Sequence, residues 1–195
     1  MSSRSRQDRF TAAVLFTYSR RDPISWLISW GQRLEKEENY IPSHVAIVSS
    51  YDPDKKGGYI WEATVGGVQR SPITKYISRR HVSYIAVPPL SVPQKEGICS
   101  WAHKFAGRGY GYLDLLVYFI DLLGHRLGLR RGWLTRRLNK PRHLVCSEFV
   151  GYCYGRGAHY RFRDNQGHWI RPSDLTPLDI WLEARRAGWE LVRVS

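Results

Sequence analysis

The sequence predicts an α+β domain with a central antiparallel sheet packed by helices, and three observations carry that prediction. Residues 43–48 are rich in β-branched side chains, which is typical of a strand. Residues 59–64 form a similar run after a turn that contains Asp-Pro-Asp and Gly-Gly, so the two runs make an antiparallel hairpin. From Cys146 to Cys153, apolar residues recur at i, i+3, i+4 and i+7, which is one face of a helix. Strands and helices mixed in this way along the chain favour the α+β class.

The remaining elements follow from the same signals. Pro23 opens a helical pattern that closes near Lys36, and Pro177 opens the last helix, which runs to about Ala187. Further strands are expected over residues 12–17, 82–87 and 189–194, and further helices over residues 74–78, 93–107 and 113–127. Residues 1–9 are polar and basic and are expected to form a flexible arm, which leaves residues 10–195 as a single domain.

The composition excludes several classes of protein. A hydrophobic fraction of 43% with 8 Trp and 12 Tyr in 195 residues is typical of a globular domain and not of a disordered chain. No apolar run reaches the roughly 18 residues that a membrane span needs, and the N-terminal pattern is not that of a signal peptide, so we expect synthesis in the cytoplasm. Three cysteines without paired spacing favour a reducing compartment. No zinc-binding or nucleotide-binding motif is present, so no cofactor or metal is expected.

The formal net charge of +13 predicts an anionic partner, which could be nucleic acid, a cell-wall polymer, a membrane surface or an acidic protein. Residues 122–147 contain seven Lys or Arg and no acid. Within them, the candidate polyanion-binding residues are Arg130, Arg131, Arg136 and Arg137. The alternative is that this stretch is a solvated loop without a partner.

Cys146 is the strongest candidate for a nucleophile. Pro141 lies shortly upstream, so the helix is expected to begin near Cys146 itself. A thiol in the first turn of a helix faces the positive end of the helix dipole and unpaired backbone N–H groups, and both favour the reactive thiolate. The alternative is a structural cysteine in the core, which is how we interpret Cys99 and Cys153.

His44 and Glu62 supply a candidate base and a carboxylate to orient it. They lie 18 residues apart, one on each strand of the hairpin, with a connecting loop expected to span about eight to ten residues. Cross-strand neighbours are about 4.5–5.5 Å apart at Cβ, so Glu62 could hold an imidazole nitrogen. An unpaired charge in the apolar strand that contains Glu62 would be costly. With Cys146 these residues would form a nucleophilic triad. The alternative is an ordinary strand histidine beside a surface carboxylate, and His143 is a weaker candidate for the base because it is so close in sequence to Cys146.

The order of these motifs resembles the circularly permuted branch of the NlpC-type papain-like cysteine hydrolases. The motifs are Ser43-His44-Val45-Ala46-Ile47-Val48, then Trp61-Glu62-Ala63, then Cys146-Ser147-Glu148-Phe149-Val150. Ordinary members carry the cysteine helix before the histidine strand, whereas permuted members carry it last. The resemblance spans about residues 12–180 and implies a permuted papain-like fold. It also implies that His44 is the base, Glu62 the orienting residue and Cys146 the nucleophile, with the backbone N–H of Cys146 in an oxyanion hole.

The resemblance implies a thiol hydrolase, a peptidase or amidase that cleaves an amide bond in bacterial peptidoglycan peptides through an acyl-enzyme. The permuted branch also contains lipid-directed amidases and acyltransferases, so a lipid substrate stays open. A third alternative is a bacteriophage virion or tail protein that keeps the fold without the chemistry, or that combines both roles and contacts other virion components through its basic stretch. The candidate cleft residues are Tyr110, Tyr112 and Ser147, and aromatic packing is an equally good interpretation of the two tyrosines.

Overall fold

The computed structural model describes residues 8–19, 29, 39–109 and 144–195, and all elements named below lie within those ranges. In chain order they are β1 (Val14–Ser19), β2 (His44–Asp52), β3 (Gly57–Thr64), β4 (Gly67–Pro72), η1 (Ile73–Lys75), β5 (His81–Val87), α3 (Val92–Lys104), α6 (Cys146–Ala158), η2 (Pro172–Asp174), α7 (Pro177–Arg186) and β6 (Glu190–Arg193). The elements η1 and η2 are short 3-10 helices. The helices expected over residues 23–36 and 113–127 lie outside the described residues.

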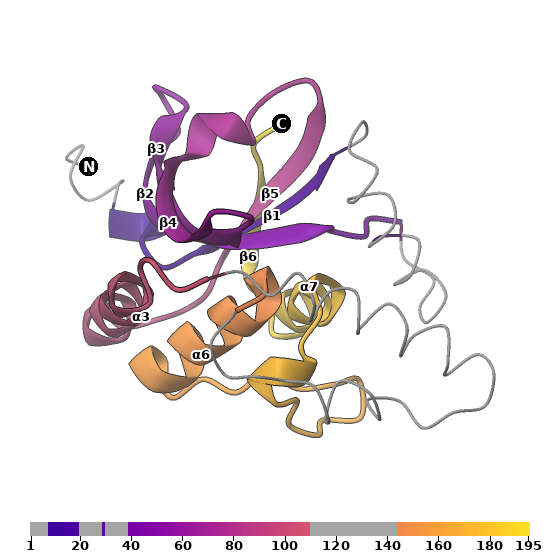
Figure 1. Ribbon diagram of the computed structural model, residues 1–195. Coiled ribbons are helices and arrows are strands. Elements are labelled where there is room, and N and C mark those ends of the chain that lie inside the picture. Colours follow the sequence, from indigo (N-terminus) through magenta and orange to yellow (C-terminus); the bar gives the residue numbers. More distant parts are fainter. Residues whose placement is uncertain (1–7, 20–28, 30–38, 110–143) are drawn as a thin grey trace.

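Six strands form one antiparallel sheet in the order β4-β3-β2-β1-β5-β6. The central strand β1 is apolar and largely buried, and it pairs with β2 on one side and with β5 on the other. The sheet curves strongly, and α3, α6 and α7 lie together on one side of it (Figure 1). The predicted α+β class, with an antiparallel sheet packed by helices, is therefore confirmed.

The hairpin of β2 and β3 has the predicted pairing but a shorter connection. Both strands extend further than expected, so only residues 53–56 lie between them, not eight to ten residues. The carboxylate of Asp52 accepts hydrogen bonds from the backbone N–H groups of Asp54 and Lys55, which closes the turn. The register shifts between Val48 and Ser50, where β2 contains an irregularity.

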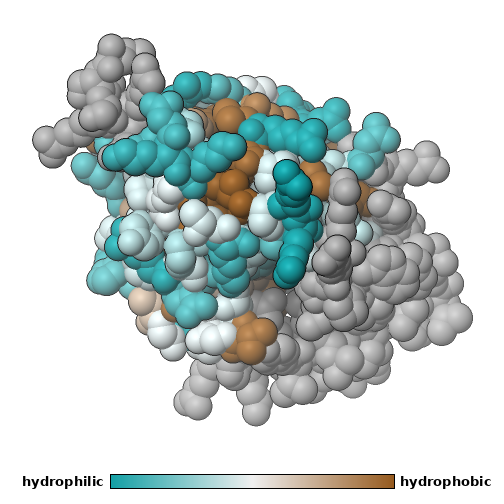
Figure 2. Space-filling view, turned by 90° about the horizontal axis from the view of Figure 1, so that it is seen from above, coloured by the Kyte–Doolittle hydropathy of each residue, from teal (hydrophilic) through white to brown (hydrophobic). Residues whose placement is uncertain are grey.

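Two apolar clusters fill the two faces of the sheet. The larger one joins α6 and α7 to the sheet through side chains such as Val45, Ile47 and Phe149. The smaller one lies on the opposite face and includes Leu15, Ile60 and other residues of the inner strands. The alternation of side chains along a strand separates the two sets. Figure 2, which views the molecule from above, shows hydrophobic groups near the centre of the curved sheet, bordered by hydrophilic ones.

The helix α6 is held close to α3. A Cβ built on Gly157 would lie 2.4 Å from the backbone nitrogen of Ile98, and one on Gly97 would lie 2.2 Å from the carbonyl oxygen of Gly157. These two glycines let the backbones approach, and ring contacts of Phe105 with Phe149 continue the interface toward the start of α6. The two helices therefore run antiparallel, which fixes the N-terminal end of α6 against the sheet.

The last two elements of the chain are α7 and the edge strand β6, which Arg9 near the N-terminus contacts. The last helix, α7, begins where the sequence predicts, with a capping box between Thr176 and Asp179. Within the arm expected over residues 1–9, Arg9 forms an ion pair with Glu190 of β6, and residues 1–7 lie outside the described part of the chain. Among the described residues, no helix combines the length and apolar character needed to cross a membrane.

Candidate active site

The hairpin brings His44 and Glu62 into contact. Nε2 of His44 lies 3.1 Å from Oε2 of Glu62. The pairing of Ile47 with Trp61 places Glu62 opposite Ala46, so His44 and Glu62 are diagonal neighbours on one face of the sheet. The predicted contact between the two side chains is thus confirmed, with a diagonal geometry in place of a direct cross-strand pair.

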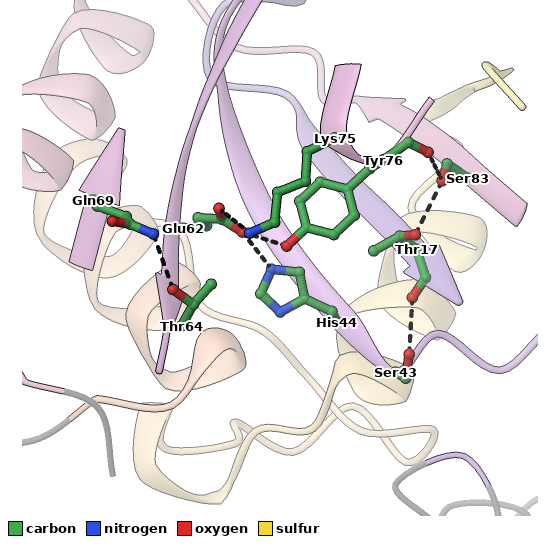
Figure 3. Close-up of polar contacts among 9 residues, drawn as sticks. All are labelled: Thr17, Ser43, His44, Glu62, Thr64, Gln69, Lys75, Tyr76 and Ser83. Carbon is green, nitrogen blue, oxygen red and sulfur yellow. Dashed lines mark hydrogen bonds and ion pairs between the residues drawn. The ribbon is translucent and has the colours of Figure 1, made fainter. Parts of the chain in front are cut away.

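The carboxylate of Glu62 is completely buried, yet it has several hydrogen-bond donors. Nζ of Lys75 lies 3.0 Å from Oε1, and the hydroxyl of Tyr76 donates to Oε2 at 2.5 Å (Figure 3). Burial alone would raise the pKa of this carboxyl, but the hydrogen bond and charge of His44, together with hydrogen bonds from Ser71 and Tyr76, hold it well below its usual range. Glu62 therefore carries a full negative charge beside the imidazole.

Tyr76 also packs against the imidazole of His44. The two rings stack with centroids 5.4 Å apart and an interplanar angle of 29°. The side chain of His44 is only 17% exposed, so the tyrosine ring and the carboxylate together fix its orientation. Because Nε2 faces Glu62, Nδ1 is the ring nitrogen that remains for a second partner.

Cys146 is the first residue of α6, as the sequence predicts. The preceding residue, Val145, is extended and provides no side-chain cap, so the first N–H groups of the helix are open to another acceptor. The thiol of Cys146 forms a hydrogen bond with the side chain of His44. Its sulfur also accepts hydrogen bonds from the backbone N–H groups of Val45 and Ser147. The thiol therefore lies beside the first residues of β2, the strand that begins at His44.

The pKa values of the cysteine and histidine move in opposite directions. Burial alone would raise the pKa of Cys146, but the hydrogen bond and charge of His44 and the two backbone N–H groups outweigh it and lower that pKa. Burial alone would lower the pKa of His44, but hydrogen bonds to Cys146 and Glu62 raise it to about 9. Because the pKa of His44 is raised and that of Cys146 is lowered, a thiolate–imidazolium pair is favoured at neutral pH.

Of the other predicted site residues, only Ser147 lies in the described part of the chain, and it does not join this group. Ser147 is buried, and its hydroxyl donates to the carbonyl of Leu175 at 2.6 Å, so its side chain holds η2 and does not line a cleft. The predicted cleft tyrosines, the rival base and the polyanion-binding arginines lie outside the described residues; they are Tyr110, Tyr112, His143, Arg130, Arg131, Arg136 and Arg137.

The two remaining cysteines have the opposite electrostatic setting from Cys146. Burial raises the pKa of Cys99, and it raises that of Cys153 well above its ordinary value. Cys153 is completely buried in the larger apolar cluster, and Cys99 packs against that cluster while partly exposed. Cys153 is thus a core residue, as the sequence indicates, whereas Cys99 lies at the edge of the core.

Lys75 and Tyr76 are the site residues that sequence reasoning missed. They follow β4, a strand whose Gly, Gln, Arg, Ser and Pro residues gave no strand signal. One signal was available, because a buried carboxylate has about four acceptor positions and a single histidine fills only one of them. The sequence therefore allowed the prediction that further donors to Glu62 come from the segment that follows its strand.

The donors around Glu62 do not form a metal centre. The ammonium of Lys75 and the hydroxyl of Tyr76 take up the carboxylate lone pairs that a cation would need. Within the described ranges, no group of three or more His, Cys, Asp or Glu side chains is placed to hold a metal ion. The arrangement fits proton transfer and nucleophilic attack better than ligation.

Comparisons with known proteins show the fold alone. No family model matches the chain, and no curated protein matches it. A similar solved structure is that of the metalloprotein yiiX, DUF1105, from Escherichia coli O157:H7. The two chains are 19% identical with a TM-score of 0.51, and the match covers 80% of this chain and 71% of that one. The overall α+β fold of this chain is thus similar to that of the metalloprotein.

Proposed function

We propose that this protein is a cysteine hydrolase of the permuted papain-like type, with Cys146 as nucleophile, His44 as base and Glu62 as the orienting carboxylate. The observation that carries the proposal is the continuous chain of contacts from the thiol through the imidazole to a buried, ionised carboxylate. The order along the chain, with the histidine strand before the cysteine helix, supports the permuted arrangement that the sequence resembles.

The first half of the reaction is acyl transfer to the thiol. The thiolate of Cys146 attacks the carbonyl carbon of the substrate, and the negative charge moves to the carbonyl oxygen. In this proposal the backbone N–H of Cys146, at the start of α6, donates to that oxygen. The imidazolium of His44 gives its proton to the leaving amine as the carbon–nitrogen bond breaks, which leaves an acyl-enzyme and a neutral imidazole.

The second half restores the starting state. Neutral His44 takes a proton from water, the resulting hydroxide attacks the thioester, and the carbon–sulfur bond breaks. The products are a carboxylic acid and the thiolate–imidazolium pair. Throughout both halves, Glu62 fixes the imidazole ring and stabilises its positive charge without accepting the proton itself, because its pKa is held so low.

The substrate that fits the resemblance best is an amide bond in bacterial peptidoglycan peptides. A lipid acyl group is the second candidate, since the same acyl-enzyme chemistry serves an ester or a lipid amide. A bacteriophage virion or tail protein that keeps the fold without the chemistry is the non-enzymatic alternative, and the net charge of +13 is the observation that favours it.

Mass spectrometry of the intact protein separates these three cases. The full chain is incubated with purified peptidoglycan fragments and, separately, with phospholipid vesicles, and the mass added at Cys146 is measured by peptide mapping. A peptidyl adduct supports the proposed substrate, and Cys146→Ala is expected to remove both the adduct and the hydrolysis. Cys99→Ala is the matched control, because Cys99 lacks a histidine partner in the site, and it is expected to keep both.

Two outcomes count against the proposal. A fatty-acyl adduct would replace the peptidoglycan substrate with a lipid one while leaving the triad in place. No adduct with either substrate, together with a Cys146 thiol no more reactive than that of Cys99, would leave the structural alternative.

A further inference from the structure

The carboxylate of Glu62 divides its two oxygens between different partners. Oε1 accepts from Lys75 at 3.0 Å, whereas Oε2 accepts from Tyr76 at 2.5 Å and contacts His44 at 3.1 Å. Because Glu62 is buried, its remaining acceptor positions need donors, and Lys75 and Tyr76 supply them from the segment that follows β4. The side chain of Lys75 is 48% exposed, so it reaches the buried carboxylate from the surface.

Tyr76 contacts two members of the site at once. Its hydroxyl holds Glu62, and its ring stacks on His44. Its other ring neighbour is His81, at 5.6 Å between centroids, and the backbone carbonyl of Tyr76 accepts from Ser83. Figure 3 shows Lys75 and Tyr76 approaching the carboxylate from the side of η1, with His44 below. The tyrosine is therefore held in place by β5 while it holds the site.

We propose that Lys75 and Tyr76 are positioning residues that act on the nucleophile through Glu62 and His44. Tyr76 keeps Oε2 of Glu62 beside Nε2 of His44, and Lys75 draws the other oxygen toward the surface. The two residues have opposite effects on the imidazole. Tyr76 holds the carboxylate in contact with the imidazole, whereas Lys75 competes with the imidazole for the negative charge of the carboxylate. This proposal rests on the proposed function, in which that imidazole faces Cys146.

The groups that face the two partners determine the sign of each effect. Around His44 they are Cys146 of α6, Glu62 of β3 and Tyr76, and around Glu62 they also include Lys75 and Ser71. Lys75 is the only lysine or arginine among these named groups. Removing a positive charge from the neighbourhood of an imidazolium makes it easier to keep its proton, so the pKa of His44 should rise. Removing the tyrosine hydroxyl frees the carboxylate to turn toward Lys75, so the pKa of His44 should fall.

The first test is the titration of His44 by nitrogen NMR in the full chain. We expect Lys75→Met to raise the pKa of His44 by about half a unit, since the lysine is half exposed and screened by solvent. Lys75→Arg should restore the wild-type titration because it restores the charge. Lys55→Met is the matched control, as Lys55 is 83% exposed at the far end of the same hairpin and should have no effect.

The second test separates the hydroxyl of Tyr76 from its ring. Tyr76→Phe keeps the stacking and should lower both the pKa of His44 and the alkylation rate of Cys146 at neutral pH. The rate should fall by about threefold to tenfold, the range that corresponds to one ordinary hydrogen bond. Tyr76→Ala removes the stacking as well and should slow alkylation further. Tyr59→Phe, at an exposed tyrosine of the same sheet, is the control and should react like the wild type.

Opposite shifts in Lys75→Met and Tyr76→Phe support the proposal. Superimposable titrations of the two variants and the wild type would overturn it, and so would shifts of the same sign in both. Neither readout needs a substrate, so a failure to hydrolyse peptidoglycan would contradict the proposed function and leave this test intact.

Discussion

Cys146 and Cys153 lie two turns apart on α6 and differ little in burial, yet the pKa values of their thiols are shifted in opposite directions. Cys146 is 5% exposed and Cys153 is 0% exposed. Burial raises the pKa of Cys153 well above its ordinary value, and the nearby thiol of Cys99 adds to that effect. The same burial acts on Cys146, but His44 and two backbone N–H groups reverse it and lower the pKa.

The difference shows that the polar partners at the start of α6, His44 first among them, reverse the effect of burial on the thiol pKa. At the first turn of α6 the backbone N–H groups have no partner within the helix and can donate to sulfur. Two turns later every N–H is used by the helix itself, and the side chain of Cys153 is buried in the larger apolar cluster. One residue type on one helix thus has its pKa lowered at one end and raised in the middle.

The largest effect on the reactivity of Cys146 should come from removing His44, the partner that Cys146 has and Cys153 lacks. His44→Ala is expected to slow the labelling of Cys146 by iodoacetamide at a pH of about 6.5 by roughly a hundredfold, because burial would then raise the pKa of its thiol as it does for Cys153. Peptide mapping after brief exposure gives the rate at each cysteine. In the wild type, Cys146 should be labelled first.

The control in this experiment is Cys153, whose slow labelling should not change in His44→Ala. Equal modification of all three cysteines in the wild type would contradict the comparison. So would a His44→Ala variant in which Cys146 reacts at the wild-type rate.

A smaller effect is expected from Glu62, which acts on the thiol only through His44. Glu62→Gln keeps an oxygen that can accept from the imidazole, so turnover should fall by about tenfold to a hundredfold, far less than in Cys146→Ala. Glu62→Ala should be slower still, since it leaves the buried donors Tyr76 and His44 without their acceptor. The measurement is turnover per folded molecule, with circular dichroism to confirm folding. Near-normal turnover in Glu62→Ala would remove it from the triad.

The sequence predicts those parts of the site whose structure is determined by a few neighbouring residues, and it misses those determined by contacts with distant ones. The start of α6 at Cys146 and the pairing of the strands that carry His44 and Glu62 follow from proline placement and β-branched runs, which act over a few residues. Strand β4 was missed because its pairing with β3 is decided by the neighbouring strand and not by its own side chains. Lys75 reaches Glu62 only because β4 turns the chain back, so its role depended on the strand that was missed.

The smallest effect, and the one that tests the ion pair most directly, is on the pH dependence of stability. The pKa of His44 is raised from 6.5 to about 9, so its stabilising contribution is complete below about pH 6.5 and is lost as the pH rises toward 9. The pKa of Cys146 is lowered from 9.0, so its contribution is complete above pH 9 and is lost as the pH falls through the lowered value. Across the interval between 6.5 and 9 the two slopes have opposite signs.

The pair should therefore contribute no net slope in that interval, because folding only moves a proton from the thiol to the imidazole and the folded and unfolded chains bind equal numbers. Cys146→Ser removes the titrating thiol and leaves His44 beside Glu62, so its stability should decline with pH where the wild type is flat. We expect the wild-type free energy of unfolding minus that of Cys146→Ser, measured in urea, to increase from about pH 6.5 to pH 9. The limit is about 1.4 kcal/mol per pH unit, and groups outside the pair cancel in the subtraction. A difference that stays constant over this interval would mean that His44 loses its raised pKa in Cys146→Ser, so that the contact with Cys146, and not the contact with Glu62, supplies the rise.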